Sequence, residues 1–225
     1  LLPSDGAHNN YFGQSVAISG NTAIVGAFGD DDNGGFSGSA YLFDIATGAE
    51  LTKLLPNDGA SSDQFGRSAA ISGNTAIVGA PQNDDNGIES GSAYLFDITS
   101  GTQLAKLLPS DGALGDLFGC SVAIDGNTAI VGAYTDDDNG LNSGSAYLFD
   151  IASGAQIAKL LPSDGASDDW FGLSVAINGN TAIVGARLDD DNGLHSGSAY
   201  LFDATTGAQI AKLLPSDGAM DDQFG

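Results

Sequence analysis

The stretch FGCSVAIDGNTAIVGAYTDDDNGLNSGSAYLFD, from Phe118 to Asp150, decides the fold, because close copies of it fill most of the chain. Its opening Phe-Gly pair recurs every 53 residues, at Phe12, Phe65, Phe118, Phe171 and Phe224. A fixed period of this size indicates a propeller, a solenoid or an array, in which each unit buries its apolar face against its neighbours. The repeat is therefore the unit from which fold and function must be predicted.

The Phe-Gly period divides the 225 residues into complete repeats with a short piece at either end. Residues 1–11 match the end of a repeat, so we expect them to be the tail of a preceding one, and residues 224–225 to start a following one. We predict a segment of a longer array or filament, or a chain that closes with other copies, because a ring needs about 4 to 8 blades. The complete repeats are residues 12–64, 65–117, 118–170 and 171–223.

Each repeat predicts four short β-strands and no helix. The Ser-Ala-Tyr-Leu-Phe-Asp segment, for example, alternates small or aliphatic with aromatic side chains, which indicates a strand buried on both sides. Short connections between consecutive strands make the sheets antiparallel. The sequence therefore predicts an all-β fold, a β-propeller built of four-stranded antiparallel blades, with a linear or helical stack of the same units as the alternative.

A tight turn is expected between the first two strands of each repeat. Asp125-Gly126 and Asn178-Gly179 separate two β-rich runs in the third and fourth repeats. Such pairs are a strong hairpin signal, and we expect both residues of the pair to take positive φ.

The charge balance excludes several classes of partner. Six basic residues against 29 acidic ones give a net charge of −23, which argues against binding to nucleic acid or to anionic membranes. No apolar run approaches the ~20 residues of a membrane-spanning helix, so we expect no membrane insertion. Cations are the natural counter-charge. Lys53, Lys106, Lys159 and Lys212 occupy one position of the repeat, which indicates a structural role.

The loop between the second and third predicted strands carries an aspartate-rich sequence in every repeat. Loops of this kind emerge at the same end of each sheet, so we expect one acidic face. Carboxylates, an Asn amide and a Gly that permits a sharp turn are suited to calcium, whose binding would offset the repulsion. The alternative is that the aspartates are solvated turn residues. The candidate calcium ligands are Asp30, Asp31, Asp32, Asn33, Asn83, Asp84, Asp85, Asn86, Asp136, Asp137, Asp138, Asn139, Asp189, Asp190, Asp191 and Asn192.

Catalysis finds little support, and we expect no enzymatic activity. His8 and His195 do not occupy equivalent positions of the repeat, and we expect both at the surface. A glycoside hydrolase needs one asymmetric carboxylate pair, which near-identical repeats do not supply. Trp170 is a possible sugar platform, although packing beside Phe171 is favoured, and the repeated tyrosines are expected to pack in the core.

These residues resemble the FG-GAP repeat of integrin α-subunit propellers and of bacterial surface proteins. Phe-Gly opens each repeat, Gly-Ala ends the second strand, and Gly79-Ala80-Pro81 stands in the second repeat. The resemblance covers the whole chain and implies an extracellular or cell-surface propeller that serves adhesion or binding and commonly holds calcium. In integrins the calcium loop joins the first two strands. Here that connection is a tight turn, so the family's metal site does not carry over.

The favoured prediction is therefore an extracellular, calcium-binding repeat protein with a structural or adhesion role at a bacterial cell surface. The expected partners are calcium ions and other copies of the repeat, or a protein or glycan ligand on the acidic face. The alternatives are a carbohydrate- or protein-binding propeller module appended to a secreted enzyme, and a hydrolase in its own right.

Overall fold

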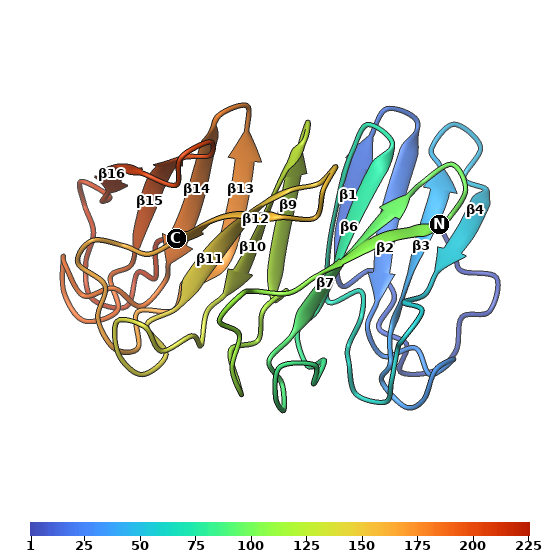
Figure 1. Ribbon diagram of the computed structural model, residues 1–225, viewed down its shortest axis with the longest axis horizontal. Coiled ribbons are helices and arrows are strands. Elements are labelled where there is room, and N and C mark those ends of the chain that lie inside the picture. The colour runs from blue at the N-terminus through green and yellow to red at the C-terminus, as the bar shows by residue number, and fades with distance from the viewer.

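The computed structural model describes residues 1–225 and shows an all-β protein of four separate antiparallel sheets (Figure 1). In every sheet, strands that are consecutive in sequence pair with one another. No helix is long and apolar enough to cross a membrane. The first sheet contains β1 (Val16–Ser19), β2 (Thr22–Ala27), β3 (Ser39–Asp44) and β4 (Glu50–Leu54). The second contains β5 (Ser68–Ser72), β6 (Thr75–Ala80), β7 (Ser92–Asp97) and β8 (Gln103–Leu107). The third contains β9 (Ser121–Asp125), β10 (Thr128–Ala133), β11 (Ser145–Asp150) and β12 (Gln156–Leu160). The fourth contains β13 (Phe171–Asn178), β14 (Thr181–Ala186), β15 (Ser198–Asp203) and β16 (Gln209–Leu213).

The hairpin between the first two strands of each sheet differs in register from the prediction. Asp125 pairs with Thr128, so the two central residues of the turn are Gly126 and Asn127. Only the glycine takes positive φ, at 55°. A glycine at the first central position is the requirement of a type II′ turn. The expectation that both residues of the Asp125-Gly126 pair take positive φ is therefore wrong, because the strand extends one residue further than predicted.

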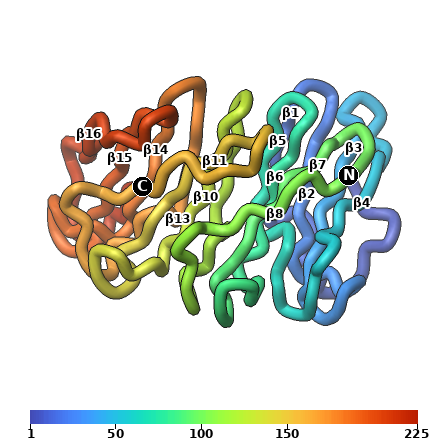
Figure 2. Tube along the Cα trace, in the orientation of Figure 1, coloured from blue at the N-terminus to red at the C-terminus, as the bar shows by residue number.

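The four sheets follow one another in an open row, and the first and last sheets lie at opposite ends of the molecule (Figures 1 and 2). The first strands of successive sheets contact each other, β1 with β5, β5 with β9 and β9 with β13. Each of the three clusters of 11 buried residues joins two neighbouring sheets, and none joins the first sheet to the fourth. The predicted four-stranded units are confirmed, and this chain arranges them as an open row without closing a ring.

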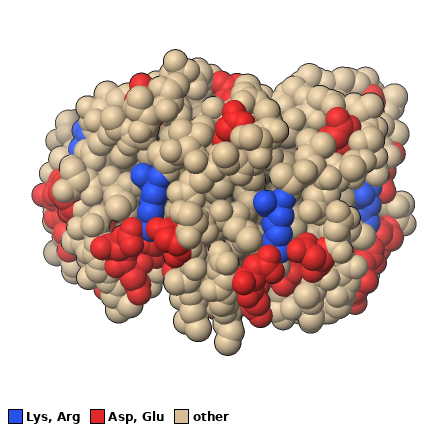
Figure 3. Space-filling model, viewed as in Figure 1, with Lys and Arg blue, Asp and Glu red and all other residues tan.

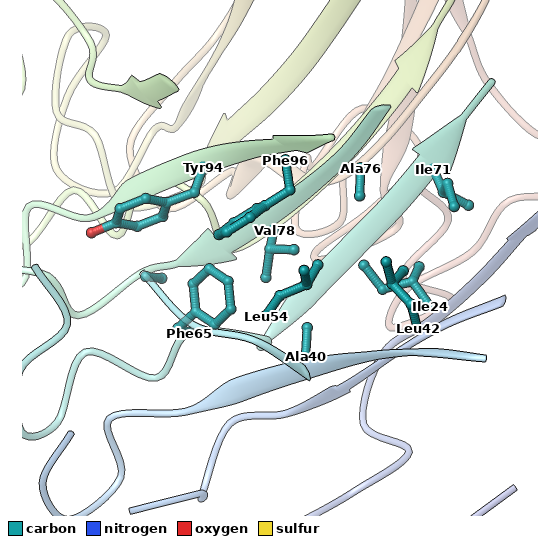
Figure 4. Packing of buried hydrophobic residues seen from close by; sticks show 11 residues of the cluster. Ile24, Ala40, Leu42, Leu54, Phe65, Ile71, Ala76, Val78, Tyr94 and Phe96 are labelled. Carbon is teal, nitrogen blue, oxygen red and sulfur yellow. The ribbon is translucent and has the colours of Figure 1, made fainter. Parts of the chain in front are cut away.

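Each sheet has two different faces, and neighbouring sheets bring unlike faces together (Figure 4). We call the face that carries Ile24, Ala40, Leu42 and Leu54 in the first sheet the aliphatic face. The opposite face, with the repeat's Phe-Gly phenylalanine and the two aromatic side chains of the third strand, is the aromatic face. In the second sheet its main residues are Phe65, Ile71, Val78, Tyr94 and Phe96.

The aromatic residues of each interface pack edge to face. The Phe118 ring is fully buried and lies 5.4 Å from Tyr147 and 5.8 Å from Phe149, with interplanar angles above 70°. This geometry suits the ring quadrupoles. The prediction that the repeated tyrosines pack in the core is confirmed, because the rings of Tyr41, Tyr94, Tyr147 and Tyr200 are all inaccessible to solvent.

The glycines of Phe-Gly and Gly-Ala are required because two repeats meet there backbone to backbone. A Cβ on Gly79 would lie 2.0 Å from the carbonyl oxygen of Gly119, which belongs to the next repeat. The Gly119 backbone is in the left-handed region at φ 94°, and its N–H donates to the carbonyl of Gly132 at 3.0 Å. The motif therefore joins each repeat to the next and fixes the spacing between sheets.

Candidate functional site

The acidic loops gather at one end of every sheet, as predicted. In Figure 3, basic side chains lie directly against clusters of acidic ones along the lower edge of the view. The connections from the second to the third strand, and from the fourth strand to the next repeat, both emerge at this end, which we call the loop end. The same topology that makes the sheets antiparallel thus brings these aspartates together.

A lysine lies at the centre of each acidic cluster. Lys159, on β12, forms ion pairs with Asp111 at 2.8 Å, Asp136 at 3.1 Å and Asp138 at 2.6 Å. Its ammonium also lies 5.2 Å from the centre of the Tyr147 ring, whose hydroxyl donates to Asp136 at 2.9 Å. The lysine side chain is only 14% exposed, so these contacts replace most of its hydration. We call this arrangement the lysine cluster.

The lysine cluster recurs in all four repeats with one variation. Lys53 pairs with Asp5, Asp30 and Asp32. Lys212 pairs with Asp164, Asp189 and Asp191. In the second repeat Asn83 stands at the position of the buried aspartate, so Lys106 pairs with Asp58 and Asp85 alone. The buried Tyr94 hydroxyl has no hydrogen-bond partner there, since the carboxylate that serves the other tyrosines is missing.

The protonation states in these clusters follow from burial and pairing. Burial alone would lower the pKa of Lys159, but hydrogen bonds to Asp111 and Asp138 raise it above its ordinary value. Burial, and then the charges of Asp136 and Asp111, raise the pKa of Tyr147. Burial opposes the ionisation of Asp111, but the contact with Lys159 leaves its pKa below the ordinary value. At neutral pH the third repeat therefore holds a charged Lys159, a neutral Tyr147 and an ionised Asp111.

The predicted calcium ligands divide by their position in the loop. The first residue is buried and faces the lysine where it is an aspartate, as in Asp136, which is 3% exposed. The second is exposed and closes its own loop, as when Asp137 accepts a hydrogen bond from the Asn142 N–H at 2.7 Å. The third is exposed and pairs with the lysine. The fourth is an asparagine whose amide donates to the adjoining loop in three repeats, as Asn139 does to the Pro162 carbonyl at 3.4 Å.

The loops as they are arranged do not form an oxygen cage for calcium. Calcium takes 6 to 8 oxygen ligands at about 2.3 to 2.6 Å. The structure contains no group of three or more His, Cys, Asp or Glu side chains with metal-binding geometry. The carboxylates of the first and third positions converge on the lysine ammonium, so a calcium ion would compete with that ammonium for the same oxygens. Calcium binding stays a prediction.

A second buried polar pair accompanies each cluster, and its composition changes from repeat to repeat. In the first repeat Asn10 donates to Asp30 at 2.9 Å, and in the second the roles reverse, since Asn83 donates to Asp63 at 3.3 Å. The equivalent residues of the third and fourth repeats are both aspartates. They are Asp116 with Asp136, and Asp169 with Asp189, each no more than 6% exposed.

The pKa of Asp116 and of Asp169 is raised to about 6. Burial is the main cause, and the negative charge of the neighbouring aspartate, Asp136 or Asp189, contributes to the rise. The third and fourth repeats therefore hold a carboxyl group that gains a proton near pH 6, whereas in the first two repeats one member of the pair is an amide.

The sequence pattern alone did not reveal that the repeated lysine lies at the centre of the acidic cluster and pairs with its aspartates. The signal was present, because the lysine, the loop aspartate and the aspartate of the preceding connection all return every 53 residues. Trp170 packs against Tyr134, with ring centres 5.5 Å apart. His195 is at the surface, as predicted, and lies 3.4 Å from Asp221.

Comparison with known proteins gives the family. A sequence model described as FG-GAP repeat matches residues 1–43, 49–96, 102–149 and 155–202. Each match ends in the third strand of a sheet, and the last three begin just before the fourth strand of the preceding sheet. No curated protein matches the chain. The matched segments contain the Phe-Gly and Gly-Ala glycines that the structure places between neighbouring repeats. Since the four matches together span most of the chain, the protein belongs to the FG-GAP repeat family.

Proposed function

We propose that this chain is a structural or adhesive module of an extracellular or cell-surface repeat array, extended by contacts between its two end faces. The family supports the location, since FG-GAP repeats are typical of extracellular and surface proteins. The uncovered apolar faces at either end of the row of sheets support the mode of extension. The repeated lysine clusters support a structural role, because in each one a lysine of the chain itself pairs with the aspartates around it.

The observation that carries the proposal is that the two open faces are the two halves of the interface already formed three times within the chain. The first sheet leaves part of its aromatic face uncovered, where Val16 is 68% and Ile18 is 64% exposed. Ile71, which is the equivalent of Ile18 in the second sheet, is 7% exposed because the first sheet covers it. At the other end, the aliphatic face of the fourth sheet is open over Ile183 and Leu201, beside hollows of about 250 and 300 Å³.

Unlike faces at opposite ends make a heterologous, head-to-tail contact, which builds rings or open filaments. The three interfaces within the chain show that such a contact is well packed in this sequence. We therefore expect the aliphatic face of one copy to dock on the aromatic face of the next, and the apolar burial to stabilise the contact by roughly 25 cal/mol per Å².

Two charged substitutions test this directly. Ile18→Glu disables the aromatic end and Ile183→Glu the aliphatic end, and both side chains lie outside the buried interfaces between sheets. Sedimentation velocity should show concentration-dependent association of the unmodified chain and monomers for either variant alone. An equimolar mixture of the two should form heterodimers and stop there, because each copy keeps one working face.

Association of Ile18→Glu by itself would mean that like faces pair, and a monomeric unmodified chain at about 100 µM would refute end-to-end extension. As a matched control, Leu104→Glu places a charge on the outer strand of the second sheet, at a side chain that is 55% exposed and far from either end face, and should leave association unchanged.

We further propose that calcium reaches the acidic loops only in competition with the lysines. The support is the ion pairing of Asp136 and Asp138 with Lys159. Removing the ammonium with Lys159→Met frees these carboxylates. Millimolar calcium should then raise the melting temperature of the variant more than that of the unmodified chain, since a ligand that binds the folded state stabilises it. Equal shifts measured by calorimetry would contradict the competition.

A further inference from the structure

The positions at which the repeats differ lie together in the folded chain. Most of each repeat is nearly invariant, but the residue before Phe-Gly is Tyr11, Gln64, Leu117 or Trp170 in the successive repeats. The residue after Phe-Gly and the residue after Gly-Ala vary as widely. All three positions flank the first and second strands at the loop end, on the inner side of the row, whereas the lysine clusters lie toward the outer strands.

Residues at all three variable positions, from neighbouring repeats, line a pocket of about 330 Å³ at the junction of the second and third sheets. We call it the seam pocket. It is lined by Gln64, Arg67, Gln82, Leu117, Cys120 and Tyr134, among others. Its size lies at the lower end of the range for small-molecule sites, which combine apolar walls with a few placed polar groups.

The polar groups of the seam pocket are held in place. The side-chain amides of Gln64 and Gln82 are hydrogen-bonded to each other, and Gln82 donates to the Glu89 carboxylate at 3.1 Å. Gln64 and Leu117 also hold the left-handed backbone region, at φ 56° and 54°. The equivalent residues Tyr11, Trp170 and Gln223 hold the same conformation, so it is a feature of the repeat itself.

Arg67 is the unusual group in this pocket. All four lysines form ion pairs with aspartates, but Arg67 forms none, although the chain carries a net charge of −23. Its guanidinium lies 5.1 Å from the centre of the Phe28 ring. Arg187, the other arginine, also lacks an ion pair, but it donates to the Gln223 side chain at 3.0 Å. An exposed guanidinium beside a pocket is suited to bind a carboxylate through two parallel hydrogen bonds.

We propose that the seam pocket binds a carboxylate-bearing sugar, with Arg67 on the carboxylate, the Gln64 and Gln82 amides on hydroxyl groups and the Tyr134 ring against the sugar body. Peptides are recognised mainly at exposed sheet edges, in apolar grooves or by basic clusters, and this compact pocket offers none of these. The acidic loop end repels polyanions, so the fitting ligand carries a single charge on an otherwise neutral body.

This inference goes beyond the scaffold role by naming a ligand class, and the end faces tested above take no part in it. The measurement is a titration of the ¹⁵N-labelled 225-residue chain followed by NMR. Three probes are used: methyl glucuronide, the neutral methyl glucoside of the same shape, and N-acetylglutamate amide as a carboxylate without a sugar.

Methyl glucuronide should shift the backbone resonances around Gln64, Gln82 and Tyr134, and the other two probes should bind at least tenfold more weakly. Arg67→Ala should weaken glucuronide binding at least tenfold. Arg187→Ala, which removes the arginine at another junction, should leave it unchanged. The assignment is overturned if glucuronide causes no shifts at 10 mM, if Arg67→Ala binds it equally well, or if the glutamate probe binds as tightly as the sugar.

Discussion

Phe118 shows how much a single residue contributes to the contact between two repeats. Its ring is fully buried between the second and third sheets and packs edge to face on Tyr147 and Phe149. Phe118→Ala should lower the free energy of unfolding by about 3 to 5 kcal/mol, because it removes apolar contacts and leaves a cavity. Phe12 is the matched control, since it is only partly buried at the open end of the row, and Phe12→Ala should cost less.

Urea unfolding followed by circular dichroism measures both changes. A loss below about 1 kcal/mol for Phe118→Ala would mean that the ring contributes little to the interface.

The aspartates Asp116 and Asp169 should make stability depend on pH. Their pKa in the folded chain is about 6, above the ordinary value of 3.8, so the folded state binds a proton more tightly than the unfolded state. The stabilisation is present in full below pH 3.8 and is lost as pH rises through about 6. The groups that face Asp116 are Asp136, Asp137 and Lys159, and those that face Asp169 are their equivalents in the fourth repeat.

The double variant Asp116→Asn/Asp169→Asn reproduces the amide that Asn10 supplies in the first repeat. Relative to this variant, the unmodified chain should lose about 1 to 2 kcal/mol per site between pH 4.5 and 7, since one pKa unit corresponds to about 1.4 kcal/mol. Melting temperatures of both proteins across that range give the difference, and parallel profiles would show that neither carboxyl holds a proton. Aspartates whose pKa is lowered, such as Asp111, make the opposite contribution to the pH dependence of stability. Because both proteins contain them, this contribution cancels in the difference between the two melting profiles.

At the scale of the element, the fourth strand carries the lysine that stabilises the loops around it. Lys159→Met leaves the buried Asp136 without its counter-charge and should cost about 2 to 4 kcal/mol, as expected when one partner of a buried ion pair is removed. Lys106→Met is the matched control. Its partners Asp58 and Asp85 are 47% and 42% exposed and Asn83 replaces the buried acid, so we expect a cost of about 0 to 1 kcal/mol.

Thermal unfolding at low and at high salt measures both variants. Equal costs would show that the buried aspartate does not set the strength of the cluster. Full retention of stability in Lys159→Met would mean that the ion pairs of this lysine contribute nothing to stability.

At the scale of the whole molecule, the open row predicts uneven stability. The second and third sheets are covered on both faces, whereas the first and fourth each have one face open. In a repeat protein the stability of a unit depends on its nearest neighbours. Hydrogen exchange should therefore be slowest in β6, β7, β10 and β11 and faster in β1, β15 and β16. Uniform protection of all four sheets in dilute, monomeric samples would contradict this picture.

Much of the fold was determined by the sequence alone, because the information is repeated. The 53-residue period, the strand alternation and the positions of Phe-Gly and Gly-Ala predicted four antiparallel units and the aromatic packing between them. The local pattern suffices here because alternate residues of a strand lie on opposite faces of the sheet. The same pattern also returns in every repeat, so each repeat supports the assignment made for the others. The topology also placed the aspartates correctly at one end of each sheet.

The tertiary structure decided what those aspartates contact. Lys159 and Asp136 are 23 residues apart on different elements, and the pattern of the sequence did not show that the lysine ammonium lies where the carboxylates converge. The open row was likewise decided only in three dimensions, since ring closure depends on the angle between sheets, which no local pattern records. The seam pocket could not be predicted from the sequence either. Arg67 and Tyr134 are isolated differences between repeats, and they line one pocket only because adjacent repeats pack together.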